Sequence, residues 1–393
     1  MKILEINKYN YPKGGADRHF LDVVLLLESK GHEVAVFSMN NPKNEPSKWN
    51  QYFASYVGYN NNDSTLFQKI IGIFRIFYSF EARRKISKLL DDFQPDIVHL
   101  HNIYHQISFS IISEIKKRNI PIIMTVHDYH LISPSKDEFL EQIGKKYWKF
   151  IFLNKKYSFP KRLLLVLKTY FEDFCGFKKK IDLFISPSFF VAKRLEKQGI
   201  EKNKIIVLPH FIPSSFLENI SEKSQENYAF YFGRISKDKG VPELMETFKN
   251  IKGIKLYLAG EIEDETKIIQ SKNIVYLGKL NKDEIKNHIN SAKFCISFSK
   301  LPETFGLIAL ESIALGKPFI GLDAGAYGEI IKSRKTGFIC KNIEEAREKI
   351  TKIISGEIIF NEENILKISR KKYGEKIYYQ KIIRLSENLT KLS

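Results

Sequence analysis

Short apolar runs alternate with longer amphipathic segments along most of the chain. Lys2–Ile6, the run G-H-E-V-A-V-F-S at 31–38, Asp96–Leu100 and Pro121–Val126 have the pattern of buried strands, and loops and helical repeats of apolar residues lie between them. Strand, helix, strand at this spacing is typical of a parallel sheet, because parallel strands need a crossover connection. The same rhythm returns between Tyr228–Phe232 and Phe319–Leu322. The pattern predicts an α/β protein.

The remaining segments fit the same plan. A chain of 393 residues is too long for one ordinary core, so we expect two domains, at 1–210 and 211–372, joined near 209–227 and followed by a terminal helix at 373–393. Further strands are expected at Asp182–Pro187, Lys204–Leu208, Lys255–Leu258, Ile274–Leu277 and Phe294–Phe298, a hairpin-like turn at 335–340, and helices at His19–Ser29, Thr65–Leu90, Ile107–Lys117, Phe189–Gln198, Glu344–Ser355 and Tyr373–Leu392.

Composition narrows the compartment. The three cysteines, Cys175, Cys295 and Cys340, have no metal-binding or redox spacing, which is typical of a reducing environment. A strand begins at the second residue, so we expect no signal peptide, and no apolar run is long enough to span a bilayer. These features predict a cytoplasmic protein.

Positive charge is concentrated in one segment. The net charge is +18, and Lys136–Lys180 holds 12 basic and 5 acidic residues interleaved with aromatic ones. No nucleic-acid-binding motif occurs in the sequence, so a nucleic acid partner is not expected. The composition is that of an interfacial amphipathic segment and predicts contact with an anionic membrane at its inner face. Three alternatives remain: an acidic acceptor, an amphipathic helix that packs its leucines on its own domain, and a generally lysine-rich proteome.

The stretch Pro302–Pro318 combines a helix start with two carboxylates. We expect a helix that begins near Phe305, capped by Thr304, whose first amides could hold an anion. Glu311 falls among apolar residues of this helix, where a carboxylate without a partner is costly, and Glu303 precedes the helix. A solvated helix face is the alternative explanation for two glutamates eight residues apart.

Other candidate residues lie where predicted strands end. Arg234 and Lys239, in the run G-R-I-S-K-D-K-G after Phe232, could together bind a diphosphate. His127 and Asp128 end another strand, where open α/β sheets bind ligands, and Gly14-Gly15 follow the first strand. Each of these could instead be an ordinary turn or a hydrogen-bonded loop residue.

Taken together, these motifs resemble a known family. E-x7-E at 303–311, F-G-R-(x4)-K-G at 232–240, K-G-G-A-D-R-H at 13–19 and the His-Asp pair at 127–128 occur in the order seen in retaining glycosyltransferases of family GT4. That resemblance covers nearly the whole chain. It implies the GT-B fold, with two facing Rossmann-like domains and a C-terminal helix that crosses back to the first.

The resemblance also implies the chemistry. A hexose would pass from a nucleotide-diphospho-sugar, by family precedent a UDP-sugar, to a hydroxyl of a glycan or lipid-linked acceptor with retention of configuration. The sequence has no D-x-D element, so we expect no metal and no cofactor. The implied residues are Glu303, His127, Arg234 and Lys239 for catalysis; Gly14, Gly15, Gly233, Arg234, Lys239, Gly278, Leu280, Glu303, Thr304, Phe305, Gly306, Leu307 and Glu311 for the nucleotide-sugar; and Arg18, His101 and Asp128 for the acceptor.

Two other functions stay open at this point. A nucleotide-sugar 2-epimerase shares the fold but needs acid–base carboxylates in the first domain, and the sequence singles none out. A non-catalytic homologue that binds a partner would usually have lost one of Glu303, Glu311, Arg234 and Lys239, all of which are present.

Overall fold

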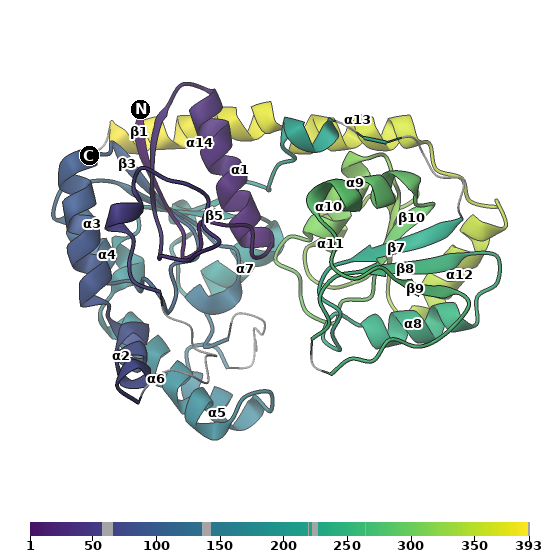
Figure 1. Ribbon diagram of the computed structural model, residues 1–393, viewed down its shortest axis with the longest axis horizontal. Helices are drawn as coiled ribbons and strands as arrows, with labels where there is room; N and C mark the ends of the chain where they lie inside the picture. The colour runs from purple at the N-terminus through teal and green to yellow at the C-terminus, as the bar shows by residue number, and fades with distance from the viewer. Residues whose placement is uncertain (57–65, 136–142, 219, 222–226, 264, 392–393) are drawn as a thin grey trace. The chain divides into compact units, whose positions relative to one another are not determined.

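A computed structural model describes residues 1–56, 66–135, 143–218, 220–221, 227–263 and 265–391 (Figure 1). The chain divides into two compact units. Unit 1 comprises Met1–Pro187, Val191–Leu208 and Tyr379–Ser393, and unit 2 comprises Ser188–Phe190 and Pro209–Tyr378. Part of the basic segment, 136–142, lies outside the described residues. No helix among the described residues has the length and apolar character needed to cross a membrane.

Unit 1 is built on a six-stranded parallel sheet of order β2-β1-β3-β4-β5-β6. The chain places β2 on one side of β1 and then returns to place β3 on the other side. The strand order therefore reverses between β1 and β3, which is the switch point of this sheet. The strands are β1 (Lys2–Ile6), β2 (Glu33–Phe37), β3 (Ile97–Leu100), β4 (Ile122–Thr125), β5 (Leu183–Ser186) and β6 (Ile205–Val207).

The helices associated with this sheet differ from the sequence prediction in three places, and one of them, expected from Ile107, begins at Ile111. The first begins at Gly15, four residues before the expected His19. The single helix expected at Thr65–Leu90 is two helices, because Ser79 starts a new one: its Oγ accepts a hydrogen bond from the Ala82 amide at 3.2 Å. The helices are α1 (Gly15–Ser29), α2 (Leu66–Phe77), α3 (Phe80–Phe93), α4 (Ile111–Lys116), α5 (Phe150–Leu153), α6 (Phe159–Phe174), α7 (Phe189–Lys197) and α14 (Glu375–Thr390), with 3-10 turns η1 (Asn50–Tyr52), η2 (Tyr129–Leu131), η3 (Tyr147–Lys149), η4 (Phe177–Lys180) and η5 (Lys202–Lys204).

Unit 2 repeats the plan with the sheet order β12-β11-β10-β7-β8-β9, again all parallel. Here the strand order reverses between β7 and β10. Buried apolar side chains cover both faces of the sheet, with Phe230 and Phe319 on one face and Tyr231 and Ile320 on the other. The strands are β7 (Tyr228–Phe232), β8 (Lys255–Ala259), β9 (Ile274–Tyr276), β10 (Phe294–Ser297), β11 (Phe319–Leu322) and β12 (Gly337–Cys340).

In this part of the chain one predicted turn was wrong, and a helix that was not predicted precedes the terminal one. The segment expected as a hairpin is β12, which pairs in parallel with β11 because α11 separates the two strands. The terminal helix expected at Tyr373–Leu392 is present at Glu375–Thr390, and a separate helix before it was missed. The helices are α8 (Val241–Lys249), α9 (Lys282–Ser291), α10 (Leu307–Ala314), α11 (Tyr327–Ile330), α12 (Ile343–Ile354) and α13 (Glu362–Tyr373), with the 3-10 turn η6 (Ser214–Leu217).

Candidate functional site

An ion pair lies at the switch point of unit 2, where the strand order reverses between β7 and β10. Lys239, in the loop after β7, donates from Nζ to Oε1 of Glu303, in the loop after β10, at 2.5 Å. In open α/β sheets, ligands bind at the carboxyl ends of the strands at such a switch point. The side chains of Lys239 and Glu303 are 20% and 17% exposed, so each is accessible yet partly desolvated. The two residues lie 64 positions apart in sequence and meet because β7 and β10 are neighbours.

The backbone around Glu303 is held by a close approach to Gly325. The Glu303 amide donates to the Ala324 carbonyl at 3.3 Å, and the Ala326 amide donates to the Glu303 carbonyl at 2.9 Å. Gly325 has φ +74°, and a Cβ there would lie 2.3 Å from the Glu303 oxygen. Ser299 adds a side-chain contact, since its Oγ donates to Glu303 Oε1 at 2.8 Å. Glu303 is therefore fixed in position by both its backbone and its carboxylate.

Arg234 lies in the same loop as Lys239 but pairs with different acids. Its Nη1 donates to Glu263 Oε2 at 2.7 Å, and its Nη2 is 3.6 Å from Asp238 Oδ2. The Tyr231 hydroxyl donates to the Arg234 carbonyl at 2.6 Å. Burial, together with the charge of Glu303, raises the pKa of Tyr231, so this hydroxyl stays a neutral donor.

Two glycines let the loops after β7 and β8 pass close to each other. Gly233 and Gly260 have φ of +148° and +144°, and a Cβ on Gly260 would lie 1.7 Å from the Gly233 carbonyl oxygen. The Gly260 amide donates to the carbonyl of Gly278, which follows β9, and Leu280 packs on the core of the unit. The three loops after β7, β8 and β9 therefore lie side by side at the carboxyl ends of these strands.

Helix α10 starts two residues later than expected, with a different cap. Gly306 is the cap, at φ +105°, and a Cβ there would lie 2.5 Å from the Tyr327 ring. Thr304 provides no cap; instead, its carbonyl accepts a hydrogen bond from Ser188 Oγ at 2.7 Å. The predicted Thr304 cap was wrong, because the chain needs a left-handed residue at this turn.

The other predicted residues of this stretch have different environments. Phe305 is 4% exposed and packs edge-on against His210, so its side chain belongs to the core. Leu307 opens α10 and is half-buried. Glu311 lies further along the same helix and is 4% exposed. A buried carboxylate on a mostly apolar helix is the feature that the sequence pattern had indicated.

In unit 1 the first two glycines form the start of α1. Gly14 is the N-cap and Gly15 the first helical residue, both exposed at the carboxyl end of β1. Asp17 follows in the first turn, where burial raises its pKa. The side-chain amide of Asn7 donates to Asp17 Oδ1 at 2.9 Å and opposes this shift. Burial lowers the pKa of Arg18 on the same helix, against the charge of Asp22. The start of α1 therefore lies beyond the carboxyl end of β1, and the Gly14 backbone amide bonds the Asp17 carboxylate.

Buried side chains from β1 and β3 connect to His127. His101 lies between two partners: its Nε2 is 2.8 Å from Glu5 Oε2, and its Nδ1 is 2.9 Å from His127 Nε2. His99 contacts the other Glu5 oxygen at 3.0 Å. Because the carboxylate only accepts, a neutral His101 must carry its proton on Nε2 and accept from His127 Nε2–H. The chain of bonds therefore fixes the tautomer of His127, whose Nδ1 is then the acceptor.

The pKa values of this cluster follow from burial and charge. Burial pushes the pKa of Glu5 upward, but the charge of His99 and the hydrogen bonds of both imidazoles lower it to about 2. Burial and the neighbouring His99 lower the pKa of His101 to about 4, against the attraction of Glu5. Each Glu5 oxygen already accepts a hydrogen bond, so the cluster is satisfied without a metal, although its ligand atoms lie within 4.8 Å of one another.

Asp128 caps a short turn. Its Oδ1 accepts a hydrogen bond from the His130 amide at 3.0 Å, at the start of η2. Burial raises the pKa of Asp128, but the charge and hydrogen bonds of His130 lower it to about 2. The capping bond explains this carboxylate structurally, and a role toward an acceptor stays a prediction.

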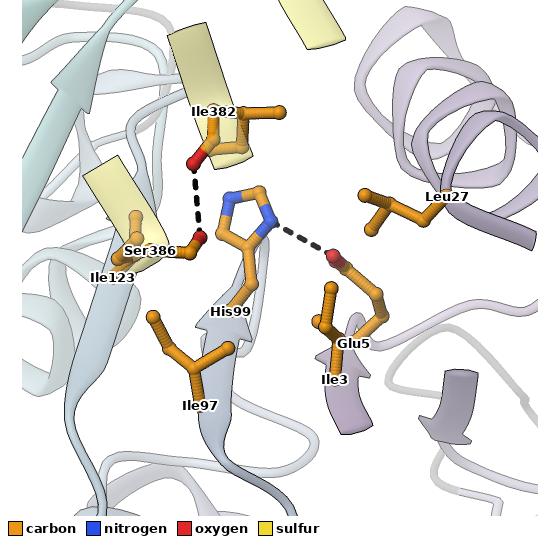
Figure 2. Close-up of a pocket in the computed structure, with 8 residues that line it drawn as sticks. All are labelled: Ile3, Glu5, Leu27, Ile97, His99, Ile123, Ile382 and Ser386. Carbon is orange, nitrogen blue, oxygen red and sulfur yellow. Dashed lines mark hydrogen bonds and ion pairs between the residues drawn. The ribbon is translucent and has the colours of Figure 1, made fainter. Parts of the chain in front are cut away.

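A small cavity in unit 1 is lined in part by Glu5, which contacts His101 (Figure 2). It is lined by β1, β3 and β4 residues together with Leu27 of α1 and Ile382 and Ser386 of α14. Six of its eight lining side chains are aliphatic or a serine, and Glu5 and His99 contact each other across one side. None of the predicted site residues lines it. The cavity places Glu5 and His99 beside Ile382 and Ser386 of α14.

Sequence reasoning missed four residues that hold the predicted ones in place. Gly325 gave no signal, because its contact with Glu303 depends on the β11 loop. Ser299 and Glu263 were hidden in polar loops. Glu5 was detectable, since an acid in the otherwise apolar strand K-I-L-E-I must be paired when buried.

Comparisons with known proteins cover both units. Residues 13–216 match the family model described as Glycosyltransferase Family 4, and residues 215–377 match the one described as Glycosyl transferases group 1. An uncharacterized 42.6 kDa protein in the cps region of Klebsiella pneumoniae is 22% identical over 88% of this chain and 91% of its own.

Two further matches are more specific. The capsular polysaccharide biosynthesis glycosyltransferase CapM of Staphylococcus aureus is 33% identical over 32% of this chain and 36% of its own. The crystal structure of Anabaena Alr3699/HepE in complex with UDP-glucose covers 99% of this chain and 100% of its own, with a TM-score of 0.63 and 15% identity. With two parallel α/β units, the structural likeness confirms the predicted two-domain GT-B fold.

Proposed function

The chain belongs to glycosyltransferase family 4, and on that premise we propose that it transfers a hexose from a nucleotide-diphospho-sugar to a hydroxyl of a glycan or lipid-linked acceptor. The fold and family make it a glycosyltransferase. The donor that we propose is a UDP-sugar, in line with the UDP-glucose bound to the HepE structure. The pathway that we propose is synthesis of a polysaccharide or glycoconjugate, in line with the similarity to CapM.

One observation carries the proposal: the Lys239–Glu303 pair at the switch point of unit 2. A cation and a carboxylate joined at 2.5 Å give adjacent sites for the two ends of a sugar diphosphate. In this proposal Lys239 and Arg234 meet the diphosphate as it departs, with the first amides of α10. Glu303 contacts the hexose near its reacting carbon.

The other residues take supporting roles in the proposal. Glu311 binds the ribose hydroxyls, and Gly233, Gly278 and Leu280 border the nucleotide. His127, with its acceptor Nδ1 set by His101, contacts a sugar hydroxyl, and the α1 start at Gly14 approaches a phosphate. Transfer proceeds with retention and without a metal, since cationic side chains and helix amides supply the charge that stabilises the leaving group.

A donor panel tests this function. Purified protein is incubated with UDP-, GDP- and ADP-hexoses in EDTA, with water as the hexose acceptor, and the nucleoside diphosphate released by hydrolysis is measured for wild type and Glu311→Gln. We expect release from one nucleotide class only and a reduced rate in the variant. Conversion of the sugar into its 2-epimer without release would establish the epimerase instead. Neither reaction, with no nucleotide binding, would establish a non-catalytic binding protein.

A further inference from the structure

Helix α6 carries a row of exposed apolar side chains on one face. A helix of a globular protein normally turns its apolar stripe inward. On α6, Leu165 and Val166 do so, packing with Phe150 of α5. The row on the other face recurs at spacings of four, four, three and four residues, which places its members on one side of a helix. Its members are Phe159 (57% exposed), Leu163 (37%), Leu167 (50%), Tyr170 (38%) and Phe174 (91%).

Neighbouring segments extend this row into a surface. The Tyr170 hydroxyl accepts a hydrogen bond from the Trp148 amide at 3.3 Å, and Trp148 contacts Phe152 edge-on at 6.2 Å between ring centroids. Trp148 and Phe152 are 50% and 70% exposed. Helix α5 packs against α6, so the two exposed sets adjoin (Figure 1). We call this row, with Trp148 and Phe152, the α6 surface.

The α6 surface lies in the most basic part of the described chain. Residues 143–180 contain 11 basic and 2 acidic side chains. Both acids are paired with lysines of the same segment: Glu172 with Lys168 at 2.8 Å and Asp173 with Lys178 at 2.6 Å. The segment therefore keeps an excess of nine positive charges beside its apolar row. Its exposed lysines include Lys145, Lys146, Lys155, Lys156 and Lys161.

We propose that the α6 surface binds an anionic phospholipid bilayer. Phenylalanine, leucine, tryptophan and tyrosine side chains enter the interfacial region, where amphipathic rings are favoured, and the lysines meet lipid phosphates. The charge excess argues against a second copy of the chain, since two such surfaces would repel each other. An apolar row this exposed argues against a purely electrostatic partner. The binding does not depend on the donor site.

Vesicle flotation tests the proposal with the full chain. Vesicles of phosphatidylglycerol and phosphatidylcholine are compared with phosphatidylcholine alone at about 0.1 M salt, and the anionic vesicles again at about 1 M, where the Debye length falls to about 3 Å. Phe174→Ser is compared with Ile359→Ser, which removes an 85% exposed apolar side chain from unit 2. Circular dichroism is used to check that both variants fold.

We expect binding to anionic vesicles only, weakened by high salt. Phe174→Ser should lower the partition coefficient about tenfold, and Ile359→Ser should leave it unchanged. Equal binding by Phe174→Ser, or equal binding to both vesicle types, would overturn the proposal. So would absence of binding at low salt, and self-association lost in Phe174→Ser would then identify a second copy as the occupant.

Discussion

At the scale of single residues, Lys239 and Glu303 have different proposed roles: one in binding the nucleotide diphosphate, the other in transfer of the sugar. In our account Lys239 serves the diphosphate and Glu303 serves the sugar, although the two bond each other at 2.5 Å. Removing the charge of Glu303 therefore should not weaken binding of the nucleotide diphosphate itself. It should weaken only what happens at the reacting carbon.

Glu303→Gln should lower the rate of sugar transfer about 10²- to 10³-fold, the usual cost of removing one group that stabilises a transition state. UDP affinity should hold or rise, because Lys239 loses a competing carboxylate. Release of nucleoside diphosphate and calorimetric UDP binding measure the two effects. Glu263→Gln is the matched control, since Glu263 pairs with Arg234 and has no proposed contact with the sugar. An equal loss of UDP affinity and rate in Glu303→Gln would contradict the division of roles.

His101 makes a separate prediction about pH. Its pKa is lowered to about 4, below the ordinary value of 6.5, so the unfolded chain binds the proton more readily. The resulting stabilisation is complete above pH 6.5 and is lost as the pH falls from about 6.5 to about 4. A shift of this size corresponds to about 3 kcal/mol.

Denaturant unfolding of wild type and His101→Gln between pH 7 and pH 4 measures this effect. The wild type should be more stable at pH 7, and the difference should narrow toward pH 4, because only the wild type loses the His101 contribution. Parallel curves for the two proteins would contradict the assigned pKa direction.

At the scale of elements, the start of α10 depends on a glycine. Gly306 has φ +105°, and its position against the Tyr327 ring leaves no room for a Cβ. Gly306→Ala should destabilise unit 2 by about 1–3 kcal/mol and displace the first amides of α10. Gly328, in α11, has open space around it, so Gly328→Ala should be neutral or slightly stabilising.

Thermal unfolding and UDP binding of both glycine variants check the prediction. We expect Gly306→Ala alone to lose stability and UDP affinity. A Gly306→Ala protein with wild-type stability would show that the turn does not require a left-handed residue.

The apolar pattern of the sequence predicted strands more accurately than it predicted the starts of helices. Apolar periodicity located the strands of both sheets except β12, because a buried parallel strand has a compact apolar run. Helix starts were less accurate, because they depend on which residue takes the special backbone conformation. Gly306 rather than Thr304 capped α10, and Ser79 divided one expected helix into α2 and α3.

At the scale of the whole molecule, the candidate residues of both units follow the carboxyl ends of strands, including the two strands between which the strand order reverses. In unit 2 these residues follow β7, β9 and β10, and in unit 1 they follow β1, β3 and β4. Motifs predicted which residues to examine, but their partners came from strand order, which local sequence does not encode. Glu5 reaches His101 across 96 positions, and Lys239 reaches Glu303 across 64.

The most direct test of the central claim is calorimetric titration of UDP into wild type, Lys239→Met and Lys255→Met. Lys255 is the first residue of β8 and lies at the amino end of the strands, whereas the switch point lies at their carboxyl ends. Its replacement therefore removes an equal charge away from the switch point. We predict that Lys239→Met weakens UDP binding about 10- to 100-fold, the value of a charge-assisted hydrogen bond, and that Lys255→Met binds as wild type. Equal affinity in wild type and Lys239→Met would contradict the placement of the donor diphosphate at the Lys239–Glu303 pair.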